Sequence, residues 1–247
     1  MSQVQNGGEP KTESSPLQTE RSAYGKVGIV GPTGQGKSYL TKTLDRLTTG
    51  YINMERKPLP YRAEQPFKHM AMPKAWAGYK KALEDYANNP EITRIVLDSQ
   101  TMAFGTLNKE MNQNFGGYDV YKNYNRQVYE YLELLKSIEK DILIFSHDEI
   151  VKLDEGSKKK MMSVHGKEFE GKIEQHFTIV LFTGTRMKDG KPNYFLRTFE
   201  QDASTKVPEG MFPNPKDNNN NFLEIPNDGK YILDCVEQYY TIPVTKS

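Results

Sequence analysis

Short apolar runs alternate with helical patterns through the first half of the chain. The runs, each short enough for a buried strand, occupy residues 26–30, 51–54, 93–97 and 141–146. Three helical patterns lie between the runs. The first has Leu40, Leu44 and Leu47 on one face and ends at Gly50, and the second has Trp76, Tyr79, Leu83 and Tyr86 on one face and ends at Asn88-Asn89-Pro90. The third has Tyr121, Tyr124, Val128, Tyr131, Leu135 and Ile138 on one face. This order predicts an α/β fold with a mostly parallel central sheet flanked by helices.

The pattern changes toward the C-terminus. Two extended runs at 177–187 and 193–200 flank Lys188-Asp189-Gly190, which predicts an antiparallel hairpin closed by a glycine-bearing turn. A last helix is expected around residues 231–240. Because the first residues carry almost no apolar side chains, we expect a disordered arm at 1–22, one domain at 23–240 and a short tail at 241–247.

A glycine-rich segment follows the first apolar run and opens the first helical pattern. Gly31-Pro32-Thr33-Gly34-Gln35-Gly36-Lys37-Ser38 matches the phosphate-binding pattern G-x-x-x-x-G-K-[S/T] in full, and Tyr39 follows it. Glycines let backbone N–H groups turn toward a phosphate, and the start of the helix adds its positive dipole end. Lys37 would bridge the β- and γ-phosphates, and the Ser38 hydroxyl would bind Mg²⁺. The alternative is a plain glycine-rich turn, but the full match predicts that residues 31–39 bind ATP with Mg²⁺.

Two carboxylates end neighbouring strands at the sheet edge where ligands bind in α/β folds. Asp98 follows the third apolar run and is the expected partner of Ser38 in holding Mg²⁺, unless it only caps the next segment. Glu55 ends the second run, where a carboxylate would activate the attacking water. The alternative for Glu55 is a surface ion pair with Arg56 or Lys57.

The order of these motifs resembles the RecA-type ATPase core. The segments that carry the resemblance are the P-loop, Asn53-Met54-Glu55, Leu97-Asp98-Ser99, Ile144-Phe145-Ser146-His147, Val180 to Arg186 with its hairpin, and Thr205 to Phe212. Within that group the chain is most similar to short stand-alone RecA cores encoded by bacteriophages, some of which act as single-strand annealing recombinases. The resemblance covers about residues 24–212.

The resemblance implies roles for further side chains. Lys37 would bind the phosphates and Glu55 would activate water. His147 would sense the γ-phosphate, and Lys206 would reach the ATP of a neighbouring subunit. RecA proteins usually carry Gln at the sensor position, so His147 departs from the family pattern, and from the residues alone it is equally a structural residue at a strand end. The implied partners are single-stranded DNA and further copies of the chain, in a ring or filament.

Mobile loops contact single-stranded DNA in that family, and the corresponding segments here are 100–117 and 148–171. The second contains Lys158-Lys159-Lys160 and Lys167, with Lys172 just after it, but nearby acids almost cancel these charges. From the residues alone it is better interpreted as a solvated charged loop. Phe104 and Phe115 in the first segment would stack on bases if exposed, although their spacing is more typical of a core.

Composition mainly excludes classes of protein. The formal net charge is +1, so nucleic-acid binding requires a local basic patch. The single Cys235 rules out an intrachain disulfide and a cysteine-rich zinc site, and it fits a reducing compartment. No apolar run approaches the roughly 20 residues of a membrane span, and the N-terminus is polar. We therefore expect a cytoplasmic protein, in the host cytoplasm if it is phage-encoded, with no membrane partner.

The sequence thus predicts a magnesium-dependent ATPase that acts on single-stranded DNA in phage recombination or replication. A small-molecule or nucleotide kinase remains an alternative because the same glycine-lysine motif occurs there, although no arginine-rich lid follows the fourth strand. The third possible function is that of a nucleotide-gated DNA-binding protein that hydrolyses little ATP. By the same resemblance, Tyr61 is a weak candidate for stacking on the adenine. His165, Glu168 and Glu170 lack the spacing of a metal site.

Overall fold

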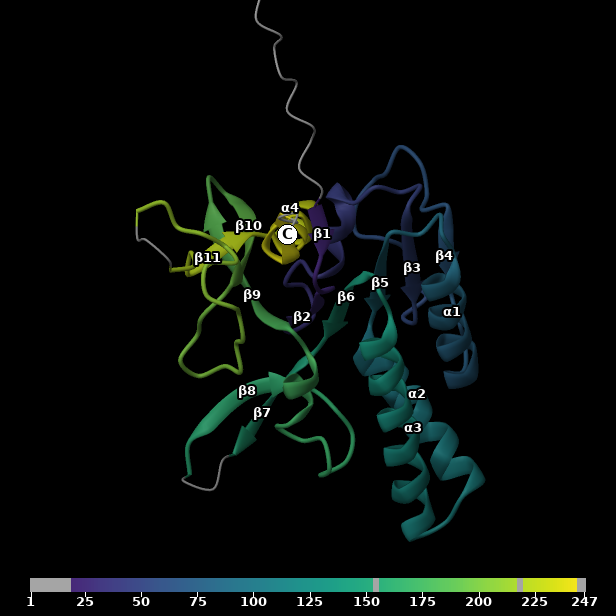
Figure 1. Cartoon of the computed structure of the whole chain (residues 1–247). Helices are drawn as coiled ribbons and strands as arrows, with labels where there is room; N and C mark the ends of the chain where they lie inside the picture. The colour runs from purple at the N-terminus through teal and green to yellow at the C-terminus, as the bar shows by residue number, and fades with distance from the viewer. Residues whose placement is uncertain (1–18, 153–155, 217–219, 244–247) are drawn as a thin grey trace, which may run out of the picture.

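The computed structural model describes residues 19–152, 156–216 and 220–243 (Figure 1). Most of the predicted arm, residues 1–18, and the end of the predicted tail, residues 244–247, lie outside them. The central sheet has the order β11-β10-β9-β2-β6-β5-β3-β4. Its strands are β2 (Lys26–Val30), β3 (Thr49–Asn53), β4 (His69–Ala71), β5 (Arg94–Asp98), β6 (Asp141–Ser146), β9 (Ile179–Lys188), β10 (Lys191–Arg197) and β11 (Glu224–Pro226).

The strands from β4 to β9 run parallel, and β10 and β11 pair antiparallel at one end of the sheet. The hairpin between β9 and β10 turns at Asp189 and Gly190, both with positive φ, as a two-residue hairpin turn requires. Both the mostly parallel sheet and the antiparallel hairpin are therefore confirmed.

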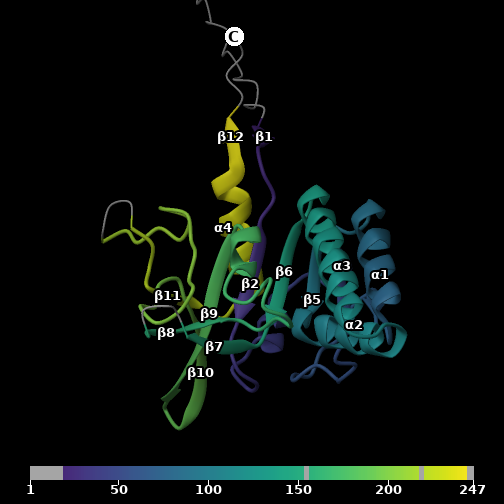
Figure 2. The ribbon, with the colours of Figure 1, turned by 90° about the horizontal axis from the view of Figure 1, so that it is seen from below.

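Helices cover the two faces of the sheet (Figures 1 and 2). α1 (Trp76–Asn88), α2 (Gln100–Asn114) and α3 (Tyr118–Ser137) pack on one face, and the short η1 (Ser38–Thr43) and α4 (Gly229–Tyr240) pack on the other. Strand β6 shows why: Ile142 and Ile144 point into the core under α1–α3, whereas Leu143 and Phe145 point into the core under α4. The continuous apolar strands thus result from a sheet buried on both faces. Within the described ranges no helix has the length and apolarity needed to cross a bilayer.

The helix after the glycine-rich segment is shorter than predicted. It is a 3-10 helix that ends at Thr43, and Gly50 lies inside β3 rather than after a helix. The Asp45 carboxylate accepts hydrogen bonds from the backbone N–H groups of Leu47 and Thr48, at 2.7 and 3.2 Å. Such local side-chain bonds compete with helical ones, so the chain turns and leaves Leu47 exposed.

The predicted DNA-contacting loop at 100–117 is instead mostly helical. α2 begins after Ser99, whose hydroxyl accepts a hydrogen bond from the backbone of Met102, and the buried Phe104 anchors it to the core. The expected charged loop at 148–171 contains an antiparallel pair, β7 (Asp148–Lys152) and β8 (Lys158–Met162), and a second 3-10 helix, η2 (Ile173–His176), follows it.

The two ends of the described chain lie side by side. β1 (Thr19–Arg21), within the predicted disordered arm, pairs antiparallel with β12 (Thr241–Pro243), within the predicted tail. The Arg21 guanidinium binds both carboxylate oxygens of the buried Asp141 at 2.6 Å, which ties this small sheet to the start of β6. Ordered structure thus extends beyond both boundaries of the predicted domain.

Candidate nucleotide site

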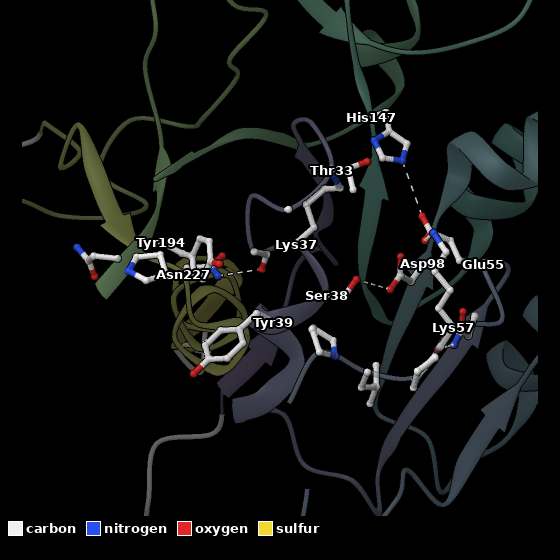
Figure 3. Close-up of a pocket in the computed structure, with 18 of the residues that line it drawn as sticks. Thr33, Lys37, Ser38, Tyr39, Glu55, Lys57, Asp98, His147, Tyr194 and Asn227 are labelled. Carbon is white, nitrogen blue, oxygen red and sulfur yellow. Dashed lines mark hydrogen bonds and ion pairs between the residues drawn. The ribbon is translucent and has the colours of Figure 1, made fainter. Parts of the chain in front are cut away.

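A cavity of about 770 Å³ opens at the carboxyl ends of the parallel strands (Figure 3). Six segments far apart in the sequence form it: the glycine-rich loop, the chain after β3, the end of β5, the end of β6, the β9–β10 hairpin and the approach to α4. Its lining residues are Thr33, Gly34, Gly36, Lys37, Ser38, Tyr39, Asn53, Glu55, Lys57, Pro58, Leu59, Pro60, Asp98, His147, Lys191, Pro192, Asn193, Tyr194 and Asn227. Lys37, Ser38, Glu55, Asp98 and His147, predicted separately, thus share one cavity.

The backbone of the loop needs its glycines. Gly34 and Gly36 have φ values of +83° and +82°, a region that other residues rarely adopt. A Cβ on Gly36 would also lie 2.7 Å from a ring carbon of Tyr194 and 2.9 Å from the amide nitrogen of Asn227. The hairpin and the approach to α4 therefore pack directly against the loop backbone.

Lys37 and Ser38 present a cation and a hydroxyl at the bottom of the cavity. The Lys37 ammonium donates hydrogen bonds to the backbone carbonyls of Gly31 and Pro32, the latter at 2.9 Å. Burial lowers the pKa of Lys37, and the nearby carboxylates of Asp98, Asp148 and Glu55 oppose that shift. Carbonyl groups of its own loop are replaceable partners, so the lysine can turn to an anion in the cavity.

Asp98 lies beside Ser38, as predicted, although β6 separates their strands in the sheet. One carboxylate oxygen of Asp98 accepts a hydrogen bond from the Ser38 hydroxyl at 2.7 Å and another from the Tyr51 hydroxyl at 2.5 Å. Burial raises the pKa of Asp98, and these two hydrogen bonds counteract the rise. Ser99, not Asp98, caps α2, so the capping alternative for Asp98 does not hold.

The residues present fit a magnesium-bound triphosphate. A hydroxyl and a carboxylate in contact are hard oxygen ligands of the kind that Mg²⁺ prefers. They lie beside a lysine and a glycine-rich loop, which suit phosphate oxygens. Ser38 and Asp98 are thus the residues that would hold the metal.

Glu55 is held at the mouth of the cavity by polar neighbours. Its carboxylate lies 2.9 Å from the Lys57 ammonium and 3.8 Å from Nε2 of His147. The His147 side chain, followed by Lys57, lowers the pKa of Glu55 to about 2. The alternative ion pair with Lys57 is therefore present, but Glu55 remains in the cavity as an ionised carboxylate able to accept a proton.

The turn after β3 places Glu55 there. The Asn53 side chain accepts a hydrogen bond from the Arg56 backbone at 2.7 Å and donates one to the Lys57 carbonyl at 2.8 Å. Arg56 has a φ of +55°, so the chain reverses directly after Glu55. His147 lies between β6 and β7. Its backbone N–H donates a hydrogen bond to the hydroxyl of Thr101 on α2 at 2.9 Å, which fixes its position.

Lys206 does not reach this cavity within the same chain. Its backbone bridges to Val180 near the start of β9, and its ammonium donates to the Phe177 carbonyl at 2.7 Å. The phosphate-binding loop follows the other, carboxyl end of the neighbouring parallel strand β2. Lys206 therefore lies toward the opposite end of the sheet from its own site.

Three cavity or near-cavity residues escaped prediction from the sequence. Tyr51 donates to Asp98, Asn227 donates to the Gly36 carbonyl at 2.9 Å, and the Tyr194 ring packs on Gly36. The short apolar run at 51–54 shows only that Tyr51 lies in a buried strand, and nothing near Tyr194 or Asn227 in the sequence indicates the loop they contact. Within the described residues, His165, Glu168 and Glu170 do not come together as a cluster of three potential metal ligands.

The sequence and the structure were compared with those of known proteins. A family model described as an AAA domain matches residues 23–209, a range that includes Lys37, Glu55, Asp98, His147 and Lys206. Among solved structures, the flagellar accessory protein FlaH from Methanocaldococcus jannaschii is similar, with a TM-score of 0.38 and 11% sequence identity over 70% of this chain and 76% of that chain. No curated protein matches the sequence.

Proposed function

This chain belongs to the AAA domain family and has the nucleotide-binding core of a P-loop NTPase, and from that premise we propose that it binds ATP with Mg²⁺ and hydrolyses the γ-phosphate. One observation carries the proposal: the hydrogen-bonded pair of Ser38 and Asp98 lies in the same cavity as Lys37 and the ionised Glu55 (Figure 3). Groups suited to phosphate binding, metal binding and water activation thus share one cavity.

Each side chain has a task in that reaction. Lys37 would leave the loop carbonyls and bind the β- and γ-phosphates, and Ser38 and Asp98 would hold Mg²⁺, which neutralises charge on the phosphates. Glu55 would accept a proton from water as its oxygen attacks the γ-phosphorus and the bond to the β-phosphate oxygen breaks, giving ADP and phosphate. His147, at 3.8 Å from Glu55, would report the state of the γ-phosphate.

We further propose that the partner is single-stranded DNA, in phage recombination or replication, as the motif order and its resemblance to phage RecA cores indicate. The β7–β8 hairpin supports this because β7 begins directly after His147. Lys158 and Lys159 lie on β8, whereas Lys160 is paired with Glu200 at 2.8 Å. Lysines on a hairpin that begins at the cavity would couple DNA contact to turnover.

The test is ATP turnover with and without single-stranded DNA at low and high salt. We expect stimulation by DNA that weakens as salt rises, because phosphate contacts release counterions. The double variant Lys158→Ala/Lys159→Ala should keep basal turnover and lose stimulation. The control Lys80→Ala/Lys81→Ala removes the same charge from α1 and should behave as wild type. Turnover that DNA never changes would refute the DNA role and leave the ATPase proposal intact.

Lys206 is proposed to act on the site of a neighbouring subunit, in a ring or filament of identical chains. Its distance from its own cavity supports this role, since a lysine at the far end of the sheet is available to another copy. Mixing Lys206→Ala with Lys37→Ala protein should restore some turnover, because one interface with both lysines can still form. Mixtures that stay inactive at every ratio would argue against it.

A further inference from the structure

The cavity has a second end that the phosphate chemistry does not use. Glu55, Asp98 and His147 lie to one side of Lys37 and Ser38, whereas Tyr39 and Tyr194 lie to the other (Figure 3). If the γ-phosphate faces Glu55, the nucleoside must extend toward the tyrosines.

Tyr39 offers an aromatic surface at this end. It lines the cavity and is 36% exposed, although it directly follows the phosphate-binding motif. Its ring is braced by Tyr194, with ring centroids 5.8 Å apart, and by the edge of Tyr61 at 6.0 Å. A braced and partly exposed ring is already positioned for a flat ligand, so little side-chain freedom is lost on binding.

Tyr61, the weak sequence-based candidate for adenine stacking, is placed differently. Its hydroxyl is hydrogen-bonded to Thr41 at 2.7 Å, and Arg46 lies 5.3 Å from the centre of its ring. Tyr61 is not among the residues that line the cavity, whereas Tyr39, which it supports, is. Of these two tyrosines, Tyr39 is therefore the one that faces the cavity.

The chain after Glu55 contributes apolar surface to the same cavity. Pro58, Leu59 and Pro60 line it, and both prolines are exposed. Their side chains have no hydrogen-bonding groups, so they suit the face of an aromatic ring rather than a phosphate. The Asn227 amide is already committed to the Gly36 carbonyl and braces the loop on the side of Tyr194.

We propose that the aromatic base of the bound nucleoside triphosphate stacks on the ring of Tyr39, in the cavity that residues 58–60 also line. This rests on the proposed function, because the phosphate position defines which way the nucleoside extends. Stacking on one ring is a contact that every nucleobase can make, and its loss weakens binding measurably.

The test compares two ligands that differ in the base. Binding of ATP and of inorganic tripolyphosphate, each with Mg²⁺, is measured for wild type and for Tyr39→Ala, Tyr39→Leu and Tyr39→Phe. We expect Ala and Leu to weaken ATP binding about tenfold, as for the loss of one base stack, and to leave tripolyphosphate binding unchanged. Phe keeps the ring and should bind ATP as wild type does.

Other outcomes have distinct meanings. Equal weakening of both ligands would show that Tyr39 only supports the loop, and unchanged ATP affinity in the Ala variant would show that the base lies elsewhere; either overturns the proposal. A Leu variant that binds ATP as tightly as wild type would exclude stacking. Wild-type protein that binds neither ligand would overturn the proposed function itself.

Discussion

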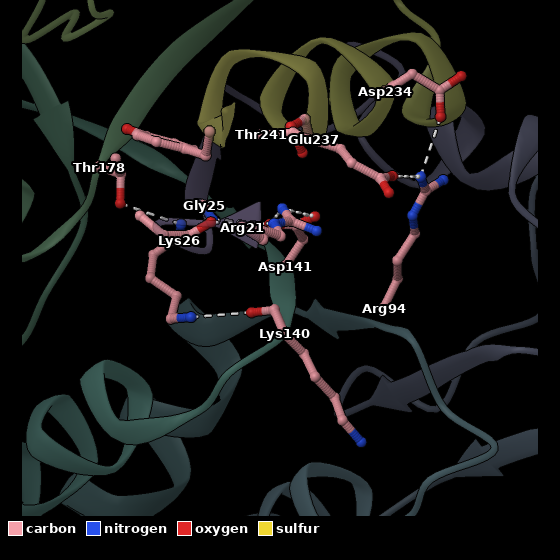
Figure 4. A network of polar contacts seen from close by, with 12 residues as sticks. Arg21, Gly25, Lys26, Arg94, Lys140, Asp141, Thr178, Asp234, Glu237 and Thr241 are labelled. Carbon is pink, nitrogen blue, oxygen red and sulfur yellow. Dashed lines mark hydrogen bonds and ion pairs between the residues drawn. The ribbon is translucent and has the colours of Figure 1, made fainter. Parts of the chain in front are cut away.

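The two ends of the parallel strands both bury a lysine and an aspartate, but with different partners. At the amino ends, Asp141 binds the Arg21 guanidinium through both oxygens and the Gly25 N–H at 2.8 Å, and Lys26 donates to the carbonyls of Ile138 and Lys140 (Figure 4). At the carboxyl ends, the described residues give the Asp98 carboxylate hydrogen bonds from hydroxyls only, and none of their lysines or arginines forms an ion pair with it.

This difference separates a structural network from a binding site. A buried carboxylate is costly unless a cation compensates it. For Asp141 this cation is the guanidinium of Arg21, which belongs to the chain itself. Among the described residues Asp98 forms no ion pair, and burial raises its pKa despite the attraction of the nearby Lys37, so its carboxylate is left for a cation that arrives with the ligand. The same residue types therefore stabilise the fold at one end and prepare binding at the other.

The largest expected effect is on turnover. Glu55→Gln keeps the shape of the side chain but removes the proton acceptor, so ATP hydrolysis should fall by roughly 10²- to 10⁴-fold, the usual contribution of a general base. Binding of Mg·ATP should persist. Steady-state phosphate release, measured beside equilibrium binding, separates the two. Hydrolysis at the wild-type rate would show that Glu55 does not activate water.

Next comes the stability of the amino-end network. Asp141→Asn leaves the Arg21 guanidinium without its anionic partner, and we expect the free energy of unfolding to fall by about 3 kcal/mol. Arg94→Ala is the matched control at the same edge: Arg94 pairs with the more exposed Asp234 and Glu237, each at 3.0 Å. Arg94→Ala should lower the free energy of unfolding by less than about 1 kcal/mol. Urea unfolding of the three proteins gives both values.

Asp98→Asn is the corresponding change at the carboxyl end, and it should behave in the opposite way. The asparagine oxygen can still accept from Ser38 and Tyr51, and the buried negative charge at this position is removed. The free energy of unfolding should therefore stay within about 1 kcal/mol of wild type or rise, while Mg·ATP binding weakens. If Asp98→Asn destabilised the fold as strongly as Asp141→Asn, the distinction between the two ends would be wrong.

A further expected effect is a pH dependence of stability at Lys26. Burial lowers its pKa from 10.5 to about 8, against the attraction of Asp141. Between these values the unfolded chain binds a proton at this lysine that the folded chain does not, so unfolding takes up a proton and stability rises with pH. Relative to Lys26→Met, the wild type should gain stability from about pH 8 to 10.5 and show no such trend below. Denaturant unfolding across this range measures the difference.

Local signals and distant contacts explain what the sequence could predict. The phosphate-binding loop is contiguous, and Glu55, Asp98 and His147 each follow an apolar run, so the rule that parallel strands end at one edge brings them together. The Tyr51–Asp98 hydrogen bond joins residues 47 positions apart, and the Arg21–Asp141 bonds join residues 120 positions apart. No pattern of neighbouring residues in the sequence indicates either contact. They depend on strand order and register, which composition and periodicity do not determine.

The two misjudged helices have local explanations. α2 has few apolar positions, with Ala103, Phe104 and Leu107 buried among polar residues, so its periodicity is weak. The helix predicted after the loop has a clear apolar face but ends early, because the Asp45 side chain binds the backbone that the next turn would use. Periodicity therefore failed where the apolar face was narrow or where a side chain competed for backbone hydrogen bonds.

The most direct test of the account is calorimetric titration of Mg·ATP into the wild-type protein, Lys37→Ala and the surface control Lys81→Ala. We expect saturable binding with a Kd below about 1 mM for wild type and control, in the range typical of enzyme substrates. Loss of the Lys37 charge should weaken binding roughly 100-fold. Wild-type protein that takes up no Mg·ATP at millimolar concentration, or a Lys37→Ala protein that binds it equally well, would contradict the account.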